Sequence, residues 1–319
     1  MEMRDCRSVP AEQAQDSDER EIDGVIEEAR SWLASQQAED GHWAFELEAD
    51  VTIPAEYIFL NHFLGDIDDD VERKLARYLR ATQEKHGGWP LYHHGDFNMS
   101  ASVKAYYALK MVGDDPNTPH MVHAREAILA AGGAAKANVF TRITLALFEQ
   151  VPWRSVPVMR VEALLLPKWA PFHMDKVSYW SRCVIVPLLV IFARKPVVDL
   201  PLKNGVSELF LSDPRRLNNL HFFQKGQPLK NCFIALDRLL KVLDPLVPRF
   251  IRDRAINLAS KWMREHTKGA GGIGAIYPAI ANATMALKLL GAKDDDPDFI
   301  RQMDAIEDLV LDSQNEAYC

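Results

Sequence analysis

The segment Asp66-Ile67-Asp68-Asp69 places three carboxyl groups within four residues. A carboxyl group held protonated in a dry cavity can donate a proton to a substrate, which is general acid catalysis. Here the run continues into Asp70 and a charged, amphipathic helical pattern, so the acids open a helix. Backbone N–H groups favour the ionised carboxylate, whereas a general acid must hold its proton. The sequence predicts Asp68 in a solvated helix N-cap, with the general-acid role as the alternative.

Two other groups of reactive side chains lack the spacing that chemistry requires. His86 and His93-His94 lie near Asp96, but adjacent histidines point apart on most backbones, and no Cys or carboxylate completes a metal-ligand pattern. Ser100-Ala101-Ser102 precedes a helical pattern without a nucleophile elbow around it, so it is typical of a helix cap. The sequence predicts no metal site and no serine nucleophile.

A segment that occurs twice, with the same intervals between its residues, indicates which secondary-structure elements position these side chains. The set Trp32, Gln37, Gly41 and Trp43 is repeated as Tyr78, Gln83, Gly87 and Trp89, and an eroded third copy runs from Trp262-Met263 through Thr267 and Gly271 to Ile273. Each copy is typical of a helix that ends at a glycine, followed by a tryptophan whose ring packs over the connection to the next helix. Because such units bury their faces only against neighbours, the chain is a repeat protein built of helix pairs.

Hydrophobic periodicity predicts an all-α chain with almost no strand-type alternation. We expect helices near 22–37, 54–64, 69–83, 99–112, 121–131, 139–149, 178–193, 232–243, 248–266, 277–290 and 297–312. Pro-rich stretches at 152–171 and 196–201 are expected to be extended connections. The closed form of stacked helix pairs is an α/α barrel.

Composition narrows the class of protein. The chain has 319 residues and a net charge of −8, which argues against a general nucleic-acid surface. Its first 20 residues are polar, unlike a signal peptide, and its longest apolar run, 183–193, is too short to span a bilayer. The cysteines are scattered, as expected in a reducing cytosol, at Cys6, Cys183, Cys232 and Cys319.

The repeated residues resemble the QW motif of triterpene cyclases, and long segments resemble the bacterial squalene–hopene cyclases. These segments are 49–65, 87–115, 138–148, 156–172, 176–188 and 272–291. The resemblance covers roughly residues 22–319 and implies the α/α-barrel (toroid) fold of the terpenoid cyclases. It also implies proton-initiated, cation-guided cyclisation of squalene to hopene, an isomerase reaction of hopanoid biosynthesis that needs no cofactor and no metal.

The resemblance covers only about the first half of a cyclase. In the family the acidic Asp-x-Asp-Asp motif lies further along, so we expect this chain to lack the general acid and to be inactive alone. We predict a polar arm over 1–21, an α/α-barrel domain of the cyclase N-terminal type over 22–292, and the start of a second, truncated barrel over 293–319.

By motif match, three positions correspond to family residues at the substrate cavity: Glu56, Phe140 and Trp180. Aromatic faces stabilise a carbocation without capturing it, and an apolar enclosure excludes water that would quench it. Apart from the motif match, a Glu before Tyr is typical of an exposed or capping position, and a Trp beside an apolar run is typical of the core. Ile280 stands where some members place a cavity Trp, and Thr144 likewise replaces a Trp, so the linear substrate is expected to differ within the family.

Residues 228–256 combine apolar and basic side chains at helical intervals, typical of a helix at the membrane interface or of one packed on the core. Because the family is monotopic, we predict membrane-facing positions at Phe233, Leu236, Leu240 and Leu243. The expected location is cytoplasmic, peripheral on the cytoplasmic face of the membrane. The expected partners are squalene or a related linear polyprenoid, a second chain carrying the missing half, and a second copy in a homodimer.

Two further function classes stay open. The chain could be a non-catalytic α-barrel module that binds lipid, or a subunit of a split cyclase. A toroid like that of the protein prenyltransferases is disfavoured, since that chemistry needs zinc ligands that the sequence does not supply.

Overall fold

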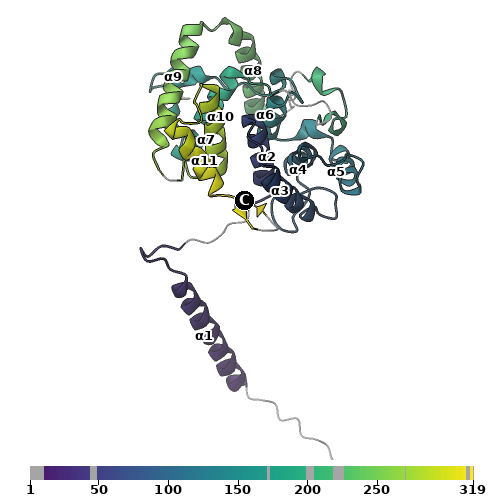
Figure 1. The fold of residues 1–319 in the computed structure, drawn as a ribbon, viewed down its shortest axis with the longest axis vertical. Helices are drawn as coiled ribbons and strands as arrows, with labels where there is room; N and C mark the ends of the chain where they lie inside the picture. The colour runs from purple at the N-terminus through teal and green to yellow at the C-terminus, as the bar shows by residue number, and fades with distance from the viewer. Residues whose placement is uncertain are drawn as a thin grey trace, which may run out of the picture. The chain divides into compact units, whose positions relative to one another are not determined.

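A computed structural model describes residues 11–43, 49–170, 173–198, 205–217, 226–269, 271–313 and 317–318, with side chains from residue 22 on. Within these ranges the chain is all-α, as predicted (Figure 1). The helices are α1 Ala11–Ser35, α2 Thr52–Leu64, α3 Asp69–Ala81, α4 Met99–Val112, α5 Pro119–Ala130, α6 Val139–Leu147, α7 Tyr179–Arg194, α8 Pro228–Leu243, α9 Arg249–His266, α10 Tyr277–Leu289 and α11 Pro297–Glu307.

The chain divides into two compact units, Met1–Leu47 and Glu48–Cys319. In the first, α1 begins at Ala11, inside the segment predicted to be a polar arm, where Ala, Glu and Gln favour helix. In the second, residues 293–319 belong to the same unit as the rest. The domain boundaries predicted after residues 21 and 292 stay predictions.

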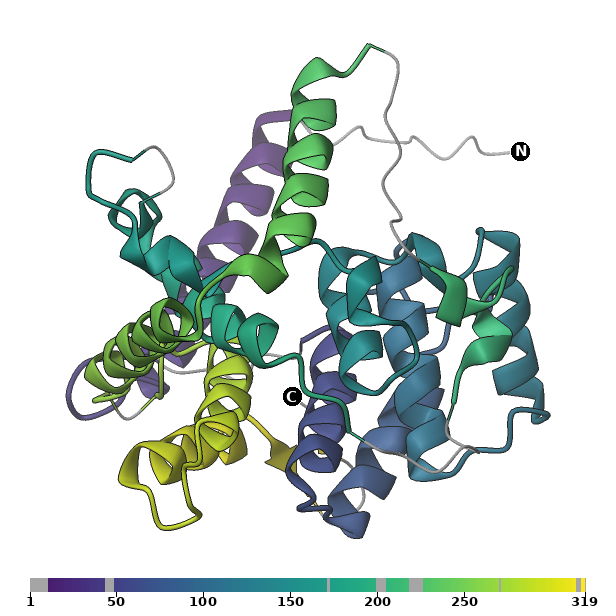
Figure 2. The same ribbon diagram turned by 90° about the horizontal axis from the view of Figure 1, so that it is seen from above.

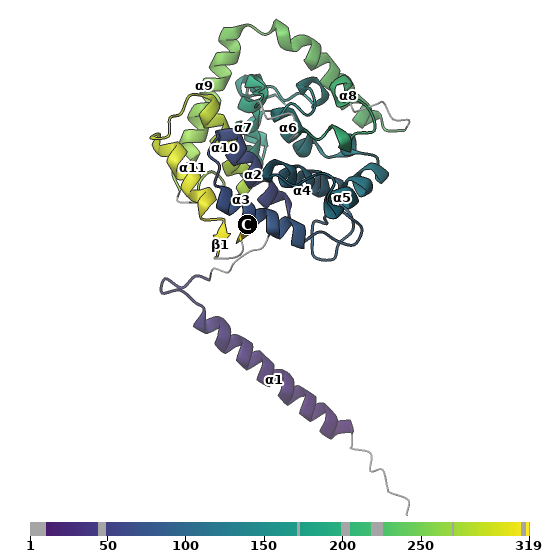
Figure 3. The ribbon, with the colours of Figure 1, turned by 45° about the vertical axis from the view of Figure 1, so that its right-hand side comes forward.

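The second unit is built of two layers of helices (Figures 1, 2 and 3). Four helices follow one another in contact along the inner layer in the order α4, α2, α10 and α7. The outer helices pack on them: α3 and α5 on α4, α11 on α10, and α9 on α7. The inner α4 is buried from Ser100 to Met111, whereas the outer α3 buries a single stripe that includes Leu75 and Leu79. This pairing matches the predicted helix-pair architecture.

Short 3-10 turns, including Trp153–Ser155 and Val161–Leu165, interrupt the first of the two connections predicted to be extended, 152–171. The described strands are two-residue pieces, β1 Leu311–Asp312 and β2 Ala317–Tyr318, which pair antiparallel. β2 packs against α3, where the ring of Tyr318 stacks on that of Tyr78 at 6.2 Å. This hairpin therefore fastens the end of the unit to its beginning.

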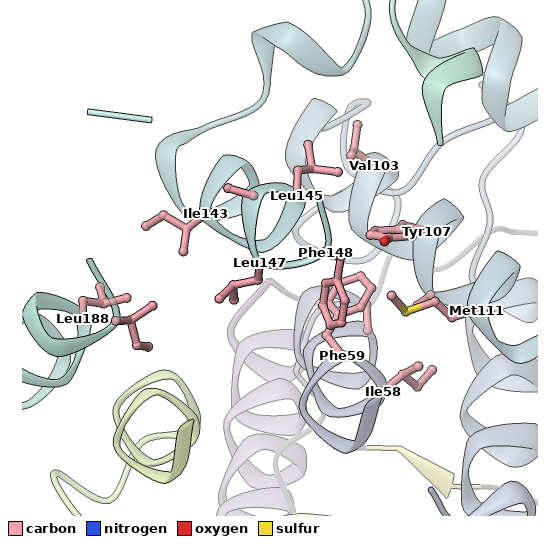
Figure 4. Packing of buried hydrophobic residues seen from close by; sticks show 14 of the residues in the cluster. Ile58, Phe59, Val103, Tyr107, Met111, Ile143, Leu145, Leu147, Phe148 and Leu188 are labelled. Carbon is pink, nitrogen blue, oxygen red and sulfur yellow. The ribbon is translucent and has the colours of Figure 1, made fainter. Parts of the chain in front are cut away.

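An aromatic group anchors the core between α2 and α4 (Figure 4). The ring of Phe59 lies 5.3 Å from that of Tyr107 and 5.9 Å from that of Phe148. Tyr107 and Phe148 meet edge to face at 6.0 Å, an arrangement favoured by ring quadrupoles. Burial raises the pKa of the Tyr107 hydroxyl, as expected in so apolar a region.

The second copy of the repeated segment closes the junction after α3. The indole Nε1 of Trp89 donates to the carbonyl of Leu79 at 2.7 Å, and the Gln83 amide donates to the carbonyl of Gly87 at 2.7 Å. The same amide nitrogen also donates to the carbonyl of His120 at the start of α5, at 3.0 Å. The copy thus ties one helix pair to the next.

The first copy repeats these bonds after α1. Trp43 Nε1 donates to the carbonyl of Leu33 at 2.7 Å, and the Gln37 amide donates to the carbonyl of Gly41 at 2.7 Å. The local geometry of both copies therefore follows from the same residues at the same spacing.

In the third copy a threonine stands in the glutamine place, and a glutamine from another helix supplies the amide. Thr267, in the glutamine place, donates its hydroxyl to the carbonyl of Met263 at 2.8 Å. Gln302 from α11 donates to that hydroxyl at 2.8 Å, while its own oxygen accepts from the backbone N–H of Ile273 at 3.2 Å. A residue from another helix thus replaces the local one.

Candidate functional site: an apolar cavity with one polar end

A cavity of about 410 Å³ opens between α2, α4, α6, α7 and α10. This volume lies within the range of small-molecule sites. In Figure 4, Leu147 of α6 and Leu188 of α7 point toward one another across this region. Most of the lining is apolar, with Ile53, Phe59, Leu60, Phe63, Ile143, Leu147, Phe148, Val184, Leu188 and Met285. Such a surface suits a hydrocarbon chain.

An ion pair interrupts the apolar lining. The Lys104 ammonium on α4 donates to Glu56 Oε1 on α2, and both residues line the cavity. The Lys104 side chain is only 6% exposed, and that of Glu56 is 23% exposed. A buried ammonium is tolerated because the carboxylate compensates its charge.

Two helix caps also line the cavity, at the start of α4 and at the start of α6. Asn98 caps α4, its side-chain oxygen accepting from the N–H groups of Ser100 and Ala101 at 3.0 Å each. Asn138 caps α6 in the same way, accepting from Thr141 at 2.9 Å. The Ser100 hydroxyl accepts from the backbone N–H of Asn138 at 2.9 Å and so joins the two caps. Asn98, Ser100 and Asn138 all line the cavity.

Of the predicted cavity residues, the structure brings Glu56 and Phe140 together in this lining. Trp180 and Ile280 are absent from the lining residues in the described part of the chain. Trp180 is 56% exposed at the start of α7. Ile280 is buried against Leu60 and Ile306, although its neighbours on α10 face the cavity.

Asp68 lies outside the cavity, exposed at the start of α3. Its Oδ1 accepts from the N–H groups of Asp70 at 2.9 Å and Val71 at 3.1 Å. This is the N-cap predicted from the sequence. Within the described residues, no group of three His, Cys, Asp or Glu side chains is arranged to hold a metal ion.

The predicted membrane-facing residues lie on or near an exposed apolar surface of α8. Phe233, Leu236 and Leu243 are exposed, and Leu240 is half-buried. Further exposed apolar side chains in α8 and in the residues that follow it are Leu229, Leu239, Val242, Leu246 and Phe250. Among the helices of the described chain, none combines the length and apolarity needed to cross a bilayer.

Sequence reasoning missed Lys104, Asn98 and Asn138. The sequence around Lys104 does not indicate its role, because a lysine in a helical pattern normally indicates a solvated face. The two asparagines precede predicted helices at 99 and 139, which is the N-cap position. That both caps face one cavity depends on tertiary packing.

Comparison with known proteins agrees with this architecture. The profile of the squalene-hopene cyclase N-terminal domain matches residues 26–315. The chain is 46% identical to a squalene–hopene cyclase of Bradyrhizobium diazoefficiens over 97% of this chain and 47% of the relative. It is 47% identical to a squalene–hopene cyclase of Zymomonas mobilis, over 94% of this chain and 46% of the relative. It is 34% identical to a squalene–hopene cyclase of Alicyclobacillus acidocaldarius, over 89% of this chain and 44% of the relative.

The chain spans about half the length of these curated relatives. The match covers nine-tenths of the chain or nearly so in each case, and it includes every helix that lines the cavity. The chain therefore belongs to the squalene–hopene cyclase family, whose N-terminal domain it matches.

Proposed function

We propose that this chain contributes one wall of the substrate cavity in a cyclase that converts squalene, or a related linear polyprenoid, to a hopene-type product. The observation that carries the proposal is the cavity of about 410 Å³ with aromatic and aliphatic walls. Phe59, Phe140 and Phe148 offer ring faces that stabilise a cation without reacting with it. The apolar walls exclude water that would end the cyclisation early.

We propose that Trp180 extends the apolar wall of the cavity. It precedes Val184 and Leu188 by one and two helical turns, and those two residues line the cavity. Residues four apart share a face of a helix. The exposed indole of Trp180 therefore lies on the same face of α7, beyond the part of the cavity that this chain encloses.

The same geometry supports the expectation that this chain alone does not cyclise squalene. Among the described lining residues, Glu56 is the one carboxyl group, and the Lys104 ammonium already donates to it. Asp68 caps a helix outside the cavity. In the proposal the proton comes from a carboxyl group on another part of the enzyme, within a longer chain or on a second polypeptide.

The exposed apolar surface of α8 supports a second element of the proposal, attachment to the membrane interface. Phe233 and Leu236 lie on this surface, and basic residues such as Arg238 and Arg249 are also exposed nearby. An amphipathic helix of this kind inserts its apolar face among lipid headgroups. A peripheral position on the cytoplasmic face would bring the cavity to a substrate that is dissolved in the bilayer.

The test is incubation of the purified chain with squalene in detergent, followed by gas chromatography–mass spectrometry. We expect squalene binding but no hopene from the chain alone. We expect hopene once the chain is co-expressed with the C-terminal half of the Zymomonas mobilis relative. Hopene from the parent alone that disappears in Asp68→Asn would instead make Asp68 the acid. Binding without complementation would favour the lipid-binding module.

A further inference from the structure

Lys104 holds more hydrogen-bond donors than the protein uses. A lysine ammonium carries three N–H donors. One donates to Glu56, and among the described residues no other acceptor contacts Lys104 Nζ. The side chain is 6% exposed and lines the cavity.

The two capping asparagines add donors to the lining of the same cavity. Each uses its side-chain oxygen to cap a helix, which leaves the amide NH₂ group free to donate. Within the described chain neither amide nitrogen has an acceptor, and both residues line the cavity. The helices that they cap, α4 and α6, also direct the positive ends of their dipoles here.

A pure hydrocarbon cannot satisfy these groups. Covering a donor with a ligand that has no acceptor removes it from water without compensation, which is unfavourable. An oxygen atom at the end of the ligand would accept from Lys104 and the asparagines while the rest of the molecule lay along the apolar wall. Since Glu56 already balances the ammonium charge, a neutral oxygen fits better than an anion.

We propose that Lys104, with Asn98 and Asn138, makes this cavity selective for linear isoprenoids that carry a neutral oxygen at one end, such as a terminal epoxide or alcohol. The inference rests on the proposed function, because it takes the apolar wall to bind a polyprenoid. Lys104 is a specificity-determining residue in this account and takes no part in proton transfer.

Squalene and its terminal epoxide form a matched pair of ligands that differ by one oxygen. We expect the full chain to bind the epoxide about tenfold more tightly than squalene, the size of one hydrogen bond to a charged donor. Binding is measured by equilibrium partition of each ligand between detergent micelles and protein. Lys104→Met keeps the length of the side chain and removes its donors, so the preference should fall to about onefold.

The chain offers matched controls. Lys110 is a second buried lysine on α4, paired with Glu208 outside the cavity, so Lys110→Met should keep the epoxide preference. Asn98→Asp keeps the helix cap and removes the amide donors, so it should weaken the preference severalfold without unfolding the chain. This variant tests the inference even where Lys104→Met destabilises the fold.

The outcomes separate the inference from the proposed function. Equal binding of squalene and epoxide by the parent chain overturns the inference and leaves the proposed function standing. Binding of neither ligand overturns both. Farnesyl diphosphate displacing the epoxide in a manner dependent on Lys104 would show an anion site and overturn the neutral-oxygen assignment.

Discussion

The two intact copies of the repeated segment have the same internal hydrogen bonds and opposite environments. In both, the tryptophan indole donates to a carbonyl ten residues earlier at 2.7 Å, and the glutamine amide donates to the glycine carbonyl at 2.7 Å. Trp89 is 0% exposed, whereas Trp43 is 48% exposed. The repeated residues thus specify a local junction, and its burial depends on what packs over it.

The second copy is covered because the helices of its own unit reach it. The Ser102 hydroxyl on α4 accepts from the backbone N–H of Trp89 at 2.9 Å. Arg80 Nε of α3 donates to Asp114 at 2.9 Å, and His120 Nε2 lies 2.7 Å from the same carboxylate. In the unit that holds the first copy, the described helix is α1 itself. Comparing the two copies therefore separates the stabilisation by hydrogen bonds within the junction from the stabilisation by the helices that pack over it.

The tryptophans give the largest expected difference between the copies. Trp89→Ala should lower the free energy of unfolding by about 3–5 kcal/mol, because it empties a fully buried site. Trp43→Ala removes a half-exposed plate and should lower it by less than about 1 kcal/mol. Urea unfolding followed by circular dichroism measures both. Equal losses would show that the hydrogen bonds of the junction, rather than its cover, carry the stability.

The glycines sharpen the comparison. Both have positive φ, +86° at Gly87 and +90° at Gly41, so a side chain strains either backbone. A Cβ at Gly87 would also lie 2.7 Å from the carbonyl oxygen of His123, whereas at Gly41 its nearest neighbour is 3.8 Å away. Gly41→Ala should cost about 1 kcal/mol and Gly87→Ala at least twice that. Similar thermal midpoints for the two variants would contradict this expectation.

The smallest expected effect depends on pH. Burial alone would raise the pKa of the Asp114 carboxyl, but hydrogen bonds from Arg80 and His120 outweigh it and hold that pKa below its ordinary value. A lowered folded-state pKa means that the stabilisation is present above the unfolded pKa of 3.8 and is lost as pH falls through the folded value. The first copy has no described counterpart of this carboxylate.

Asp114→Asn should therefore destabilise the chain at pH 6, and its difference from the parent should shrink as pH falls below about 4. Urea midpoints of parent and variant at pH 6, 4 and 3 measure this. A difference that stays constant across these values would mean that the ionised carboxylate contributes nothing beyond what the amide supplies.

The helices were predictable because their signals are local. Asp68 caps α3 as expected, and α4 runs from Met99 to Val112, the range that periodicity predicts. α1 begins at Ala11, earlier than the predicted start near residue 22, because good helix formers precede that position. The opposite burial of Trp43 and Trp89 could not be predicted, because identical residues at identical spacing met different neighbours.

The candidate site was predictable in part. Glu56 and Phe140 line the cavity, but the partner of Glu56 is Lys104, 48 positions away on another helix. A lysine in sequence normally indicates a solvated helix face. Its burial becomes visible only when α2 and α4 are placed side by side. Ile280 shows the converse, since its face of α10 turns toward α11 rather than toward the cavity.

The borrowed glutamine of the third copy bears on the order in which the protein forms during synthesis. The second junction is complete once the ribosome has released the chain through His120, and Gln83 itself lies within the repeat. The third junction must wait for Gln302, 35 residues after Thr267. Until then the end of α9 lacks its buried amide, so this half of the unit should close last during translation and expose its apolar surface longest.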